Sequence, residues 1–472
     1  MKKKIIIAGI ILLGLYLGAR GYIASKGEAY FREYVDAENR ALQGKGSMEL
    51  TRYEGDFSGA TAQVKVKLNQ GIAPALKDPL LLEFHIGNGP LFAESPVAGL
   101  IRWETRMKLA DLLKPDEAKS LAEDLKEPVT LRYDGAMAWD HRVEEHYLLS
   151  KIESKEGKGS RFSLAPTTIQ GSFDPKTLAG RWNFESAKMQ ASNPREGVDV
   201  RLEGIHGEAA VDAIEKEGPI FGSYAFGVDH ARILDPRSGL KTPILFHGDL
   251  KLGLKKEGSD RASFSVGIDL SSEDAGTRKL WEGIRQASLD LKMQGLGIQG
   301  LRDLAQLQKK EQHLREQLAQ AVGAKDDIAM QRTILALQAL QGDWVKIYND
   351  LLLPGVTTLH LDEQISTEKT SRLVLDLRYT GKALKGDSMS AMISLMAHLD
   401  RLAEGKVDLT LEKKLAQRLY PNAVFVLDSM VSKNMATLKG GVYRFHGELK
   451  DGKIIVNGTR YAPQEFVMMI LM

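Results

Sequence analysis

The segment Met48-Glu-Leu-Thr-Arg-Tyr-Glu54 alternates between apolar and polar residues, and Ala62-Gln-Val-Lys-Val-Lys-Leu68 repeats this pattern after the turn Gly55-Asp-Phe-Ser-Gly59. A period of two is typical of a β-strand with one buried face and one solvated face. Two such segments joined by a short turn are expected to pair as antiparallel neighbours. The stretch therefore predicts the beginning of an antiparallel sheet.

Further segments continue the strand pattern after this pair, and one polar helix, Ala110–Lys126, interrupts them. Strands in such a series, with few helices between them, favour antiparallel pairing over βαβ units. Because most of them alternate, we expect one apolar and one wet sheet face. The segments are Leu80–Ile86, Leu100–Leu109, Val129–Trp139, Arg161–Ile169, Arg181–Met189, Val198–Leu202, Ile220–Asp229, Ile244–Leu254, Ala262–Leu270 and Ala287–Met293.

Two helices are predicted next, over Leu301–Val322 and Asp326–Leu353, with Asp326 or Asp327 as the N-cap of the second. Each has apolar residues spaced three and four apart, with one charged break at Glu311 in the first helix, and this spacing places them in one stripe along the helix. A short connection makes the pair an αα-hairpin. Its stripes could close on each other, on the sheet, or on a second protomer, so a homodimer through helices 301–353 is one alternative.

The C-terminal part returns to strands at Thr357–Glu363 and Leu373–Tyr379, and further helices and a hairpin follow. The turn Lys450-Asp451-Gly452 between two strand patterns is a strong hairpin signal. The last residues, Phe466–Met472, are all apolar, so they could pack on the protein's own sheet, insert into a partner or lie on the membrane, and we favour packing on the sheet. The helices are predicted at Ser388–Leu402, Glu412–Leu419 and Asn422–Thr437.

The N-terminus has an uncharged segment, Ile5–Ala19, directly after Lys2, Lys3 and Lys4. A helix over residues 5–23 would be about 28 Å long, which nearly matches a bilayer core. We therefore expect a transmembrane helix with its basic end in the cytoplasm. A cleaved secretory signal is the alternative, but Ala19-Arg20-Gly21 is a poor cleavage site, which favours an uncleaved anchor. A second helix, Glu28–Gln43, would then act as a stalk.

The chain has 472 residues, a net charge of +2 and no cysteine. A net charge this close to zero gives no indication of a nucleic-acid-binding surface. Without cysteine the chain forms no disulfide bond. The predicted fold class is α+β: an N-terminal transmembrane helix, then a large, mainly antiparallel β envelope domain with an inserted α-helical hairpin. The predicted parts are an anchor (1–23), a linker helix (24–45), a β-rich domain (46–300), the hairpin (301–353), and an α+β part that completes the sheet (354–472).

Three patterns could carry chemistry, and for each we favour a structural interpretation. Gly295-Leu-Gly297-Ile-Gln-Gly300 matches a dinucleotide-binding fingerprint, but a long helical region follows where a second strand is required. His141 and His146 are five residues apart, so they would not share one face of a helix or strand. The sequence therefore predicts no catalytic, cofactor-binding or metal-binding residue, and no cofactor.

A His-Gly-acid motif occurs three times, beginning at His206, His247 and His446. The motif could mark a scattered metal or proton site. We favour a repeated strand register, because His247-Gly-Asp-Leu-Lys251 and His446-Gly-Glu-Leu-Lys450 correspond over five residues.

Several segments resemble the YdgA-like family of bacterial proteins. They are Tyr30-Phe31, Leu50-Thr-Arg-Tyr-Glu-Gly-Asp-Phe-Ser-Gly59, His85-Ile-Gly-Asn-Gly-Pro-Leu91, and Tyr443–Leu449 with Lys450-Asp-Gly and Val456-Asn-Gly458. The resemblance implies a single-pass protein of the Gram-negative inner membrane, with a cytoplasmic N-terminus and the bulk of the chain in the periplasm. It supplies no catalytic residues.

Two classes of function remain open from the sequence. The first is a membrane-tethered, non-enzymatic scaffold or binding protein of the cell envelope, which cradles a lipid or a polypeptide on an apolar sheet face. The second is an envelope enzyme such as a hydrolase. A continuous apolar face open to solvent would favour the first class, and a buried cluster of carboxylates or histidines in a cleft would favour the second.

Overall fold

The computed structural model describes residues 1–472 except 1, 43–44, 69–73, 91–98, 156–158, 216–217, 239–241, 282, 325, 341–342, 382–401 and 472. The chain forms two compact units. Unit 1 comprises Met1–Lys216 and Leu234–Gly239, and unit 2 comprises Glu217–Ile233 and Leu240–Met472. The two units are defined by the contacts that residues make within each of them. The parts inferred from the sequence were defined by changes between helix and strand periodicity, and they stay predictions.

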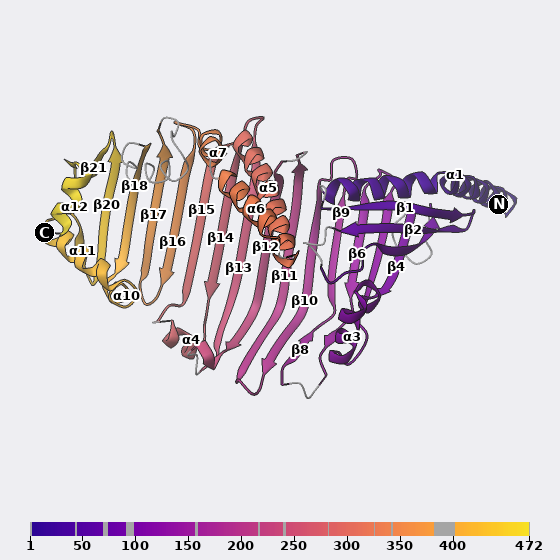
Figure 1. Ribbon diagram of the computed structural model, residues 1–472, viewed down its shortest axis with the longest axis horizontal. Coiled ribbons are helices and arrows are strands. Elements are labelled where there is room, and N and C mark those ends of the chain that lie inside the picture. The colour runs from indigo at the N-terminus through magenta and orange to yellow at the C-terminus, as the bar shows by residue number, and fades with distance from the viewer. Residues whose placement is uncertain are drawn as a thin grey trace. The chain divides into compact units, whose positions relative to one another are not determined.

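Unit 1 is an antiparallel meander with three helices (Figure 1). Neighbouring strands pair in the order β1-β2-β3-β4-β5-β6-β9-β10-β11, and β7 and β8 extend the edge beside β10. The strands are β1 (Gly46–Gly55), β2 (Gly59–Leu68), β3 (Leu80–Asn88), β4 (Gly99–Lys108), β5 (Thr130–Ala138), β6 (Val143–Leu149), β7 (Ile152–Glu153), β8 (Arg161–Leu164), β9 (Thr167–Phe173), β10 (Gly180–Asn193) and β11 (Val198–Ile214), and the helices are α1 (Lys2–Leu42), α2 (Leu109–Leu112) and α3 (Pro115–Asp124).

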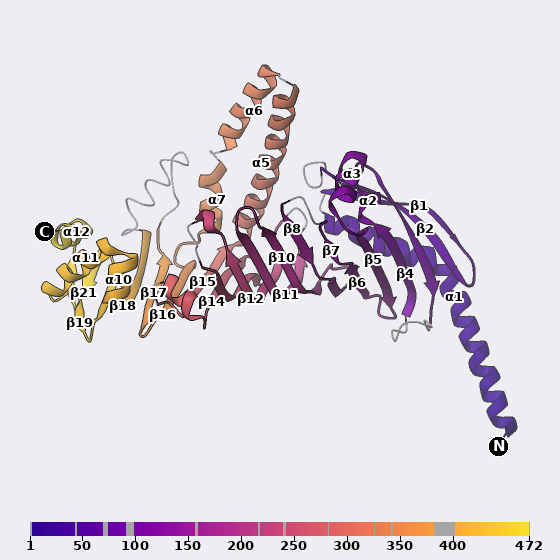
Figure 2. The same ribbon diagram turned by 90° about the horizontal axis from the view of Figure 1, so that it is seen from below.

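One long helix, α1, contributes one side of the core of unit 1, and the strands contribute most of the rest. Its residues Phe31, Tyr34 and Val35 are buried on the sheet, where the rings of Phe31 and Tyr34 meet the ring of Trp103 at 5.7 and 4.7 Å. Figure 2 shows the C-terminal half of α1 against the strands of unit 1, whereas its N-terminal part projects away from them. The predicted linker helix is therefore the C-terminal half of α1, and it serves as a packing layer and not as a stalk.

The predicted transmembrane helix, and with it the anchor in the predicted fold class, is wrong. Among the described residues, no helix is both long enough and apolar enough to cross a membrane. The predicted span is part of α1, and its C-terminal end already contacts the protein. Arg20 donates a hydrogen bond to the Ser58 carbonyl at 3.1 Å and lies over the Phe57 ring, and Ile23 is buried in the core.

Unit 2 is a second antiparallel meander, in which β12 to β18 and then β20 lie side by side (Figure 1). β21 and β19 pair with β20, and β22 pairs with β21. The strands are β12 (Ile220–Leu234), β13 (Ile244–Glu257), β14 (Arg261–Ser271), β15 (Gln286–Gly297), β16 (Thr358–Ser366), β17 (Thr370–Tyr379), β18 (Ala403–Glu412), β19 (Thr437–Lys439), β20 (Val442–Lys450), β21 (Lys453–Val456) and β22 (Thr459–Tyr461). The prediction of a mainly antiparallel β fold is confirmed.

The predicted helical hairpin is confirmed, with one difference. Helix α5 (Ile298–Ala324) packs against α6 (Asp327–Ala339) and α7 (Asp343–Leu351), so the second predicted helix is two helices. The Asp326 side chain caps α6 by accepting a hydrogen bond from the Ala329 amide at 3.0 Å. The apolar stripes face inward, and Leu307 and Ile347 are buried. Figure 2 shows α5 and α6 standing clear of the sheet of unit 2.

The C-terminus packs on its own unit, as expected. Helix α12 (Pro463–Leu471) begins at a proline, and its Phe466 and Met469 pack against a cluster that includes Leu427, Met430 and Tyr443. The predicted hairpin turn is present as well, with Asp451 and Gly452 both at positive φ, as a tight turn between twisted strands requires. The other helices in the described part of the chain are α4 (Ala275–Leu280), α10 (Lys413–Leu419) and α11 (Pro421–Ser432), with a short 3₁₀ turn at Pro236–Ser238. The helix predicted at 388–402 falls almost entirely outside the described residues.

Candidate functional site

The two faces of the unit 2 sheet differ sharply in chemistry, because side chains alternate along each strand. On one face, the strand register from β13 to β18 aligns three rows of six positions. We call this surface the apolar face. The rows are Leu250, Ile268, Leu289, Glu363, Leu373 and Leu409; Leu252, Val266, Leu291, Leu361, Leu375 and Val407; and Leu254, Phe264, Met293, Leu359, Leu377 and Gly405.

The apolar face is in contact with solvent. None of its eighteen residues is buried, and Leu250 and Leu252 each keep 37% of their surface exposed. The next strand, β12, extends two of the rows with Tyr224 and Phe226, which are 44% and 46% exposed. Soluble proteins usually cover such a face with a second layer or reserve it for binding. Sequence reasoning predicted one apolar face, and the structure confirms it.

One end of the apolar face is closed by the C-terminal helices. Leu409 on β18 and Phe445 on β20 pack against the cluster formed by Leu427 and Met430 of α11. The exposed part of the face therefore extends from β17 toward β12. A ligand that entered this surface would meet α11 as a wall on one side.

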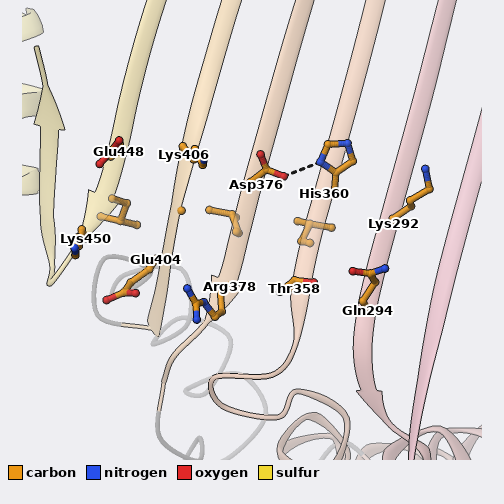
Figure 3. A pocket seen from close by; sticks show the side chains of 14 residues that line it. Lys292, Gln294, Thr358, His360, Asp376, Arg378, Glu404, Lys406, Glu448 and Lys450 are labelled. Atoms are coloured by element: carbon orange, nitrogen blue, oxygen red, sulfur yellow. Dashed lines mark hydrogen bonds and ion pairs between the residues drawn. The ribbon is translucent and has the colours of Figure 1, made fainter. Parts of the chain in front are cut away.

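The opposite face of the same strands is polar, and Figure 3 shows its side chains around an open hollow of ≈ 640 Å³. Its central row carries basic and acidic side chains on neighbouring strands: Lys292, His360, Asp376, Lys406 and Glu448. His360 Nδ1 lies 2.7 Å from Asp376 Oδ1. Opposite charges on neighbouring strands stabilise the sheet and keep this face solvated. The hollow is open, so water reaches the His360–Asp376 pair freely. Active sites commonly exclude water from their reacting groups, and this hollow does not.

Further charges on this polar face are paired in the same way. Arg372 binds Asp362 through two hydrogen bonds, the shorter at 2.6 Å, and its guanidinium lowers the pKa of that carboxyl. His446 Nδ1 lies 2.6 Å from Asp408, and this hydrogen bond raises the pKa of the imidazole. These pairs satisfy the polar face without a ligand.

Unit 1 holds a buried polar cluster under α1. The Glu145 carboxylate accepts hydrogen bonds from the hydroxyls of Tyr133 (2.8 Å) and Tyr147 (3.1 Å) and from Trp182 Nε1 (3.2 Å). Burial raises the pKa of both tyrosines well above its usual value. Three donors satisfy the buried carboxylate, so the structure explains the cluster as a hydrogen-bonded network that holds α1 and the sheet together.

Glu38 of α1 lies near this cluster and does not share its hydrogen bonds. Burial, and next the charge of Glu145, raise the pKa of the Glu38 carboxyl to about 7. The pKa is set by packing between α1 and the sheet, which makes Glu38 a reporter of how tightly the helix is docked.

The structure explains the glycine motif as a packing device. Gly295 lies two residues before the end of β15 and has φ at 66°, a conformation that favours glycine. A Cβ on Gly297 would lie 1.9 Å from the Asp350 carbonyl oxygen, and one on Gly300 would lie 2.4 Å from the Leu351 amide nitrogen. The glycines therefore let the start of α5 approach the end of α7, and no nucleotide is needed to explain them.

The histidines singled out by the sequence are not brought together. His141 lies in the β5–β6 turn with Nδ1 3.1 Å from Glu33, whereas His146 is on β6 and faces Asp134 at 3.9 Å. His206, His247 and His446 are on β11, β13 and β20. Among the described residues, no group of three or more metal-ligating side chains could hold an ion.

Comparison with known proteins gives one match. A family model described as "Bacterial protein of unknown function (DUF945)" matches residues 1–464. The chain belongs to this family. Among curated proteins and solved structures, no match to the chain was found. For this DUF945 protein, the apolar face is consequently the feature from which function is inferred.

Proposed function

We propose that the protein is a binding protein that holds a long aliphatic chain, such as the acyl tail of a lipid, on the apolar face. The observation that carries the proposal is the continuous set of leucine, valine, isoleucine and phenylalanine side chains across six paired strands, all of them at least partly exposed to solvent. Covering each Å² of apolar surface contributes about 25 cal/mol, so a ligand along one row would gain several kcal/mol.

The chemistry of the surface favours an aliphatic chain over a polypeptide. The strands from β13 to β18 are paired on both sides, so their backbone groups are already hydrogen-bonded to one another. An extended polypeptide laid on the apolar face would leave its own amide groups without partners, at a cost of about 1–3 kcal/mol for each buried group. An aliphatic chain has no such groups to satisfy.

Two adjacent residues of β17 give a matched test. Leu375 is on the apolar face, and Val374 is on the polar face between Asp362 and Asp408. We expect Leu375→Asp to weaken binding of the fluorescent dye 1-N-phenylnaphthylamine by roughly tenfold or more, because a carboxylate would have to be desolvated by the apolar dye. Val374→Asp should leave dye binding unchanged. Fluorescence titration of the full chain measures both.

Equal effects of the two substitutions would contradict the proposal, and so would an unmodified protein that does not bind the dye. Far-UV circular dichroism of both variants controls for unfolding.

The enzymatic alternative gains no support from the two polar clusters described above. The homodimer through 301–353 and the periplasmic location stay predictions. We also infer that, within its family, the protein is one of the YdgA-like members, on the segments quoted from the sequence.

A further inference from the structure

Glu363 is an exception on the apolar face. It is the only charged residue among the three rows that define this surface. Its neighbours across the strands are Leu289 and Leu373, and the residues two positions away on its own strand are Leu361 and Ile365. A carboxylate in the middle of an apolar surface is costly unless it has a partner.

Among the described residues, Glu363 has no hydrogen bond and no ion pair. Acids on the polar face of the same strands differ in this respect. Asp290 on the neighbouring strand pairs with Lys292 at 2.6 Å, and Asp362, next to Glu363 in sequence, pairs with Arg372. The charge of Glu363 on the apolar face would therefore be compensated by a group from outside the chain.

We propose that Glu363 binds the cationic or amine head of a single-chain amphiphile whose aliphatic tail lies on the apolar face. This inference rests on the proposed function and adds the chemical class of the ligand. Charge complementarity favours an ammonium group, which can donate hydrogen bonds to the carboxylate, over a carboxylate or phosphate head, which Glu363 would repel.

The geometry fixes the direction of the tail. Toward β18 and β20, the face ends at the packed residues Leu409 and Phe445 under α11. Toward β12, four strand spacings remain, or about 19 Å. One leaflet of a bilayer core is about 15 Å thick, so an acyl tail of membrane-lipid length fits between Glu363 and β12.

Competition for bound 1-N-phenylnaphthylamine tests the inference with three probes of equal tail length: dodecylamine, dodecanol and dodecanoic acid, each below its aggregation limit. In the full chain we expect dodecylamine to displace the dye at a concentration roughly five- to tenfold lower than dodecanol, with dodecanoic acid the weakest. Added salt should reduce the preference for the amine.

The decisive variant is Glu363→Gln, which keeps the shape and removes the charge. It should abolish the preference for dodecylamine and leave dodecanol displacement unchanged. The matched control is Glu404→Gln on β18, because Glu404 lines the polar hollow on the opposite face. That variant should keep the preference for the amine.

The outcomes separate the two proposals. If no amphiphile displaces the dye, the proposed function fails. If all three displace it equally, or if Glu363→Gln keeps the order of affinities, this inference alone is overturned. A Glu363→Gln protein that self-associates without any change in selectivity would also overturn it, because Glu363 would then be a charge that prevents sheets from stacking. If the variant does not fold, a salt-independent preference in the unmodified protein overturns the inference.

Discussion

Replacing Trp103 by alanine is expected to lower the free energy of unfolding of unit 1 by about 3–5 kcal/mol. Trp103 on β4 is fully buried between α1 and the sheet, and its Nε1 donates a hydrogen bond to the Tyr133 hydroxyl at 3.1 Å. Its ring also lies over Gly135 of β5, where a Cβ would be 2.3 Å away. The substitution would leave a cavity and remove one partner of a buried hydroxyl.

Hydrogen exchange of the β4 and β5 amides in increasing urea measures this change within unit 1, which a whole-chain transition would not isolate. Trp139→Ala is the control, because that tryptophan is 52% exposed. We expect the control to change stability by less than about 0.5 kcal/mol. Similar costs for the two tryptophans would contradict the packing of α1 on the sheet.

The second large effect is a dependence of unit 1 stability on pH that arises from Glu38. Burial raises the pKa of this carboxyl in the folded protein from 4.5 to about 7, so the folded state binds the proton more tightly than the unfolded state. Its contribution is therefore greatest below pH 4.5, falls as the pH rises from about 4.5 to 7, and stays at its lowest value above. The full change is at most about 3 kcal/mol.

Glu38→Gln should remove this slope and make unit 1 more stable than the unmodified protein at pH 8. Urea denaturation at a series of pH values, read from the same amides, measures the slope. Asp36→Asn is the matched control, because Asp36 is exposed on the same helix. An unchanged slope in Glu38→Gln would assign the pH dependence to another group.

The antiparallel fold could be predicted because its information is local. Alternation along strands such as β2 and the Asp451-Gly452 turn each act over a few residues. The single helix predicted at Ala110–Lys126 is two helices in the structure, α2 and α3. Proline favours the first position of a helix, so Pro115 could have shown where α3 begins. The N-terminal helix was predicted correctly as a helix, but the sequence did not show that it continues without a break to Leu42 and that its C-terminal half packs on the sheet of unit 1.

The candidate site could be predicted only in part. An apolar sheet face follows from alternation, but whether a second layer covers it depends on contacts between distant segments, and these leave no local pattern. Glu363 is the last residue of the strand predicted at Thr357–Glu363, and the prediction gives it no role of its own. Its signal was present, since Leu359, Leu361 and Ile365 set the apolar positions of that strand and Glu363 interrupts them. Its environment became visible only when the strand register was known.

The most direct test of the account is photo-crosslinking from the two faces of one strand. Benzoylphenylalanine is introduced at Leu361 on the apolar face or at His360 on the polar face of β16, and bacterial cells that produce the protein are irradiated. Intact-protein mass spectrometry then identifies any adduct. The account predicts an adduct with the mass of an aliphatic-chain molecule at position 361 and none at position 360. Equal labelling of both positions, or an adduct at 361 that consists of polypeptide, would contradict the proposal that the apolar face binds an aliphatic chain.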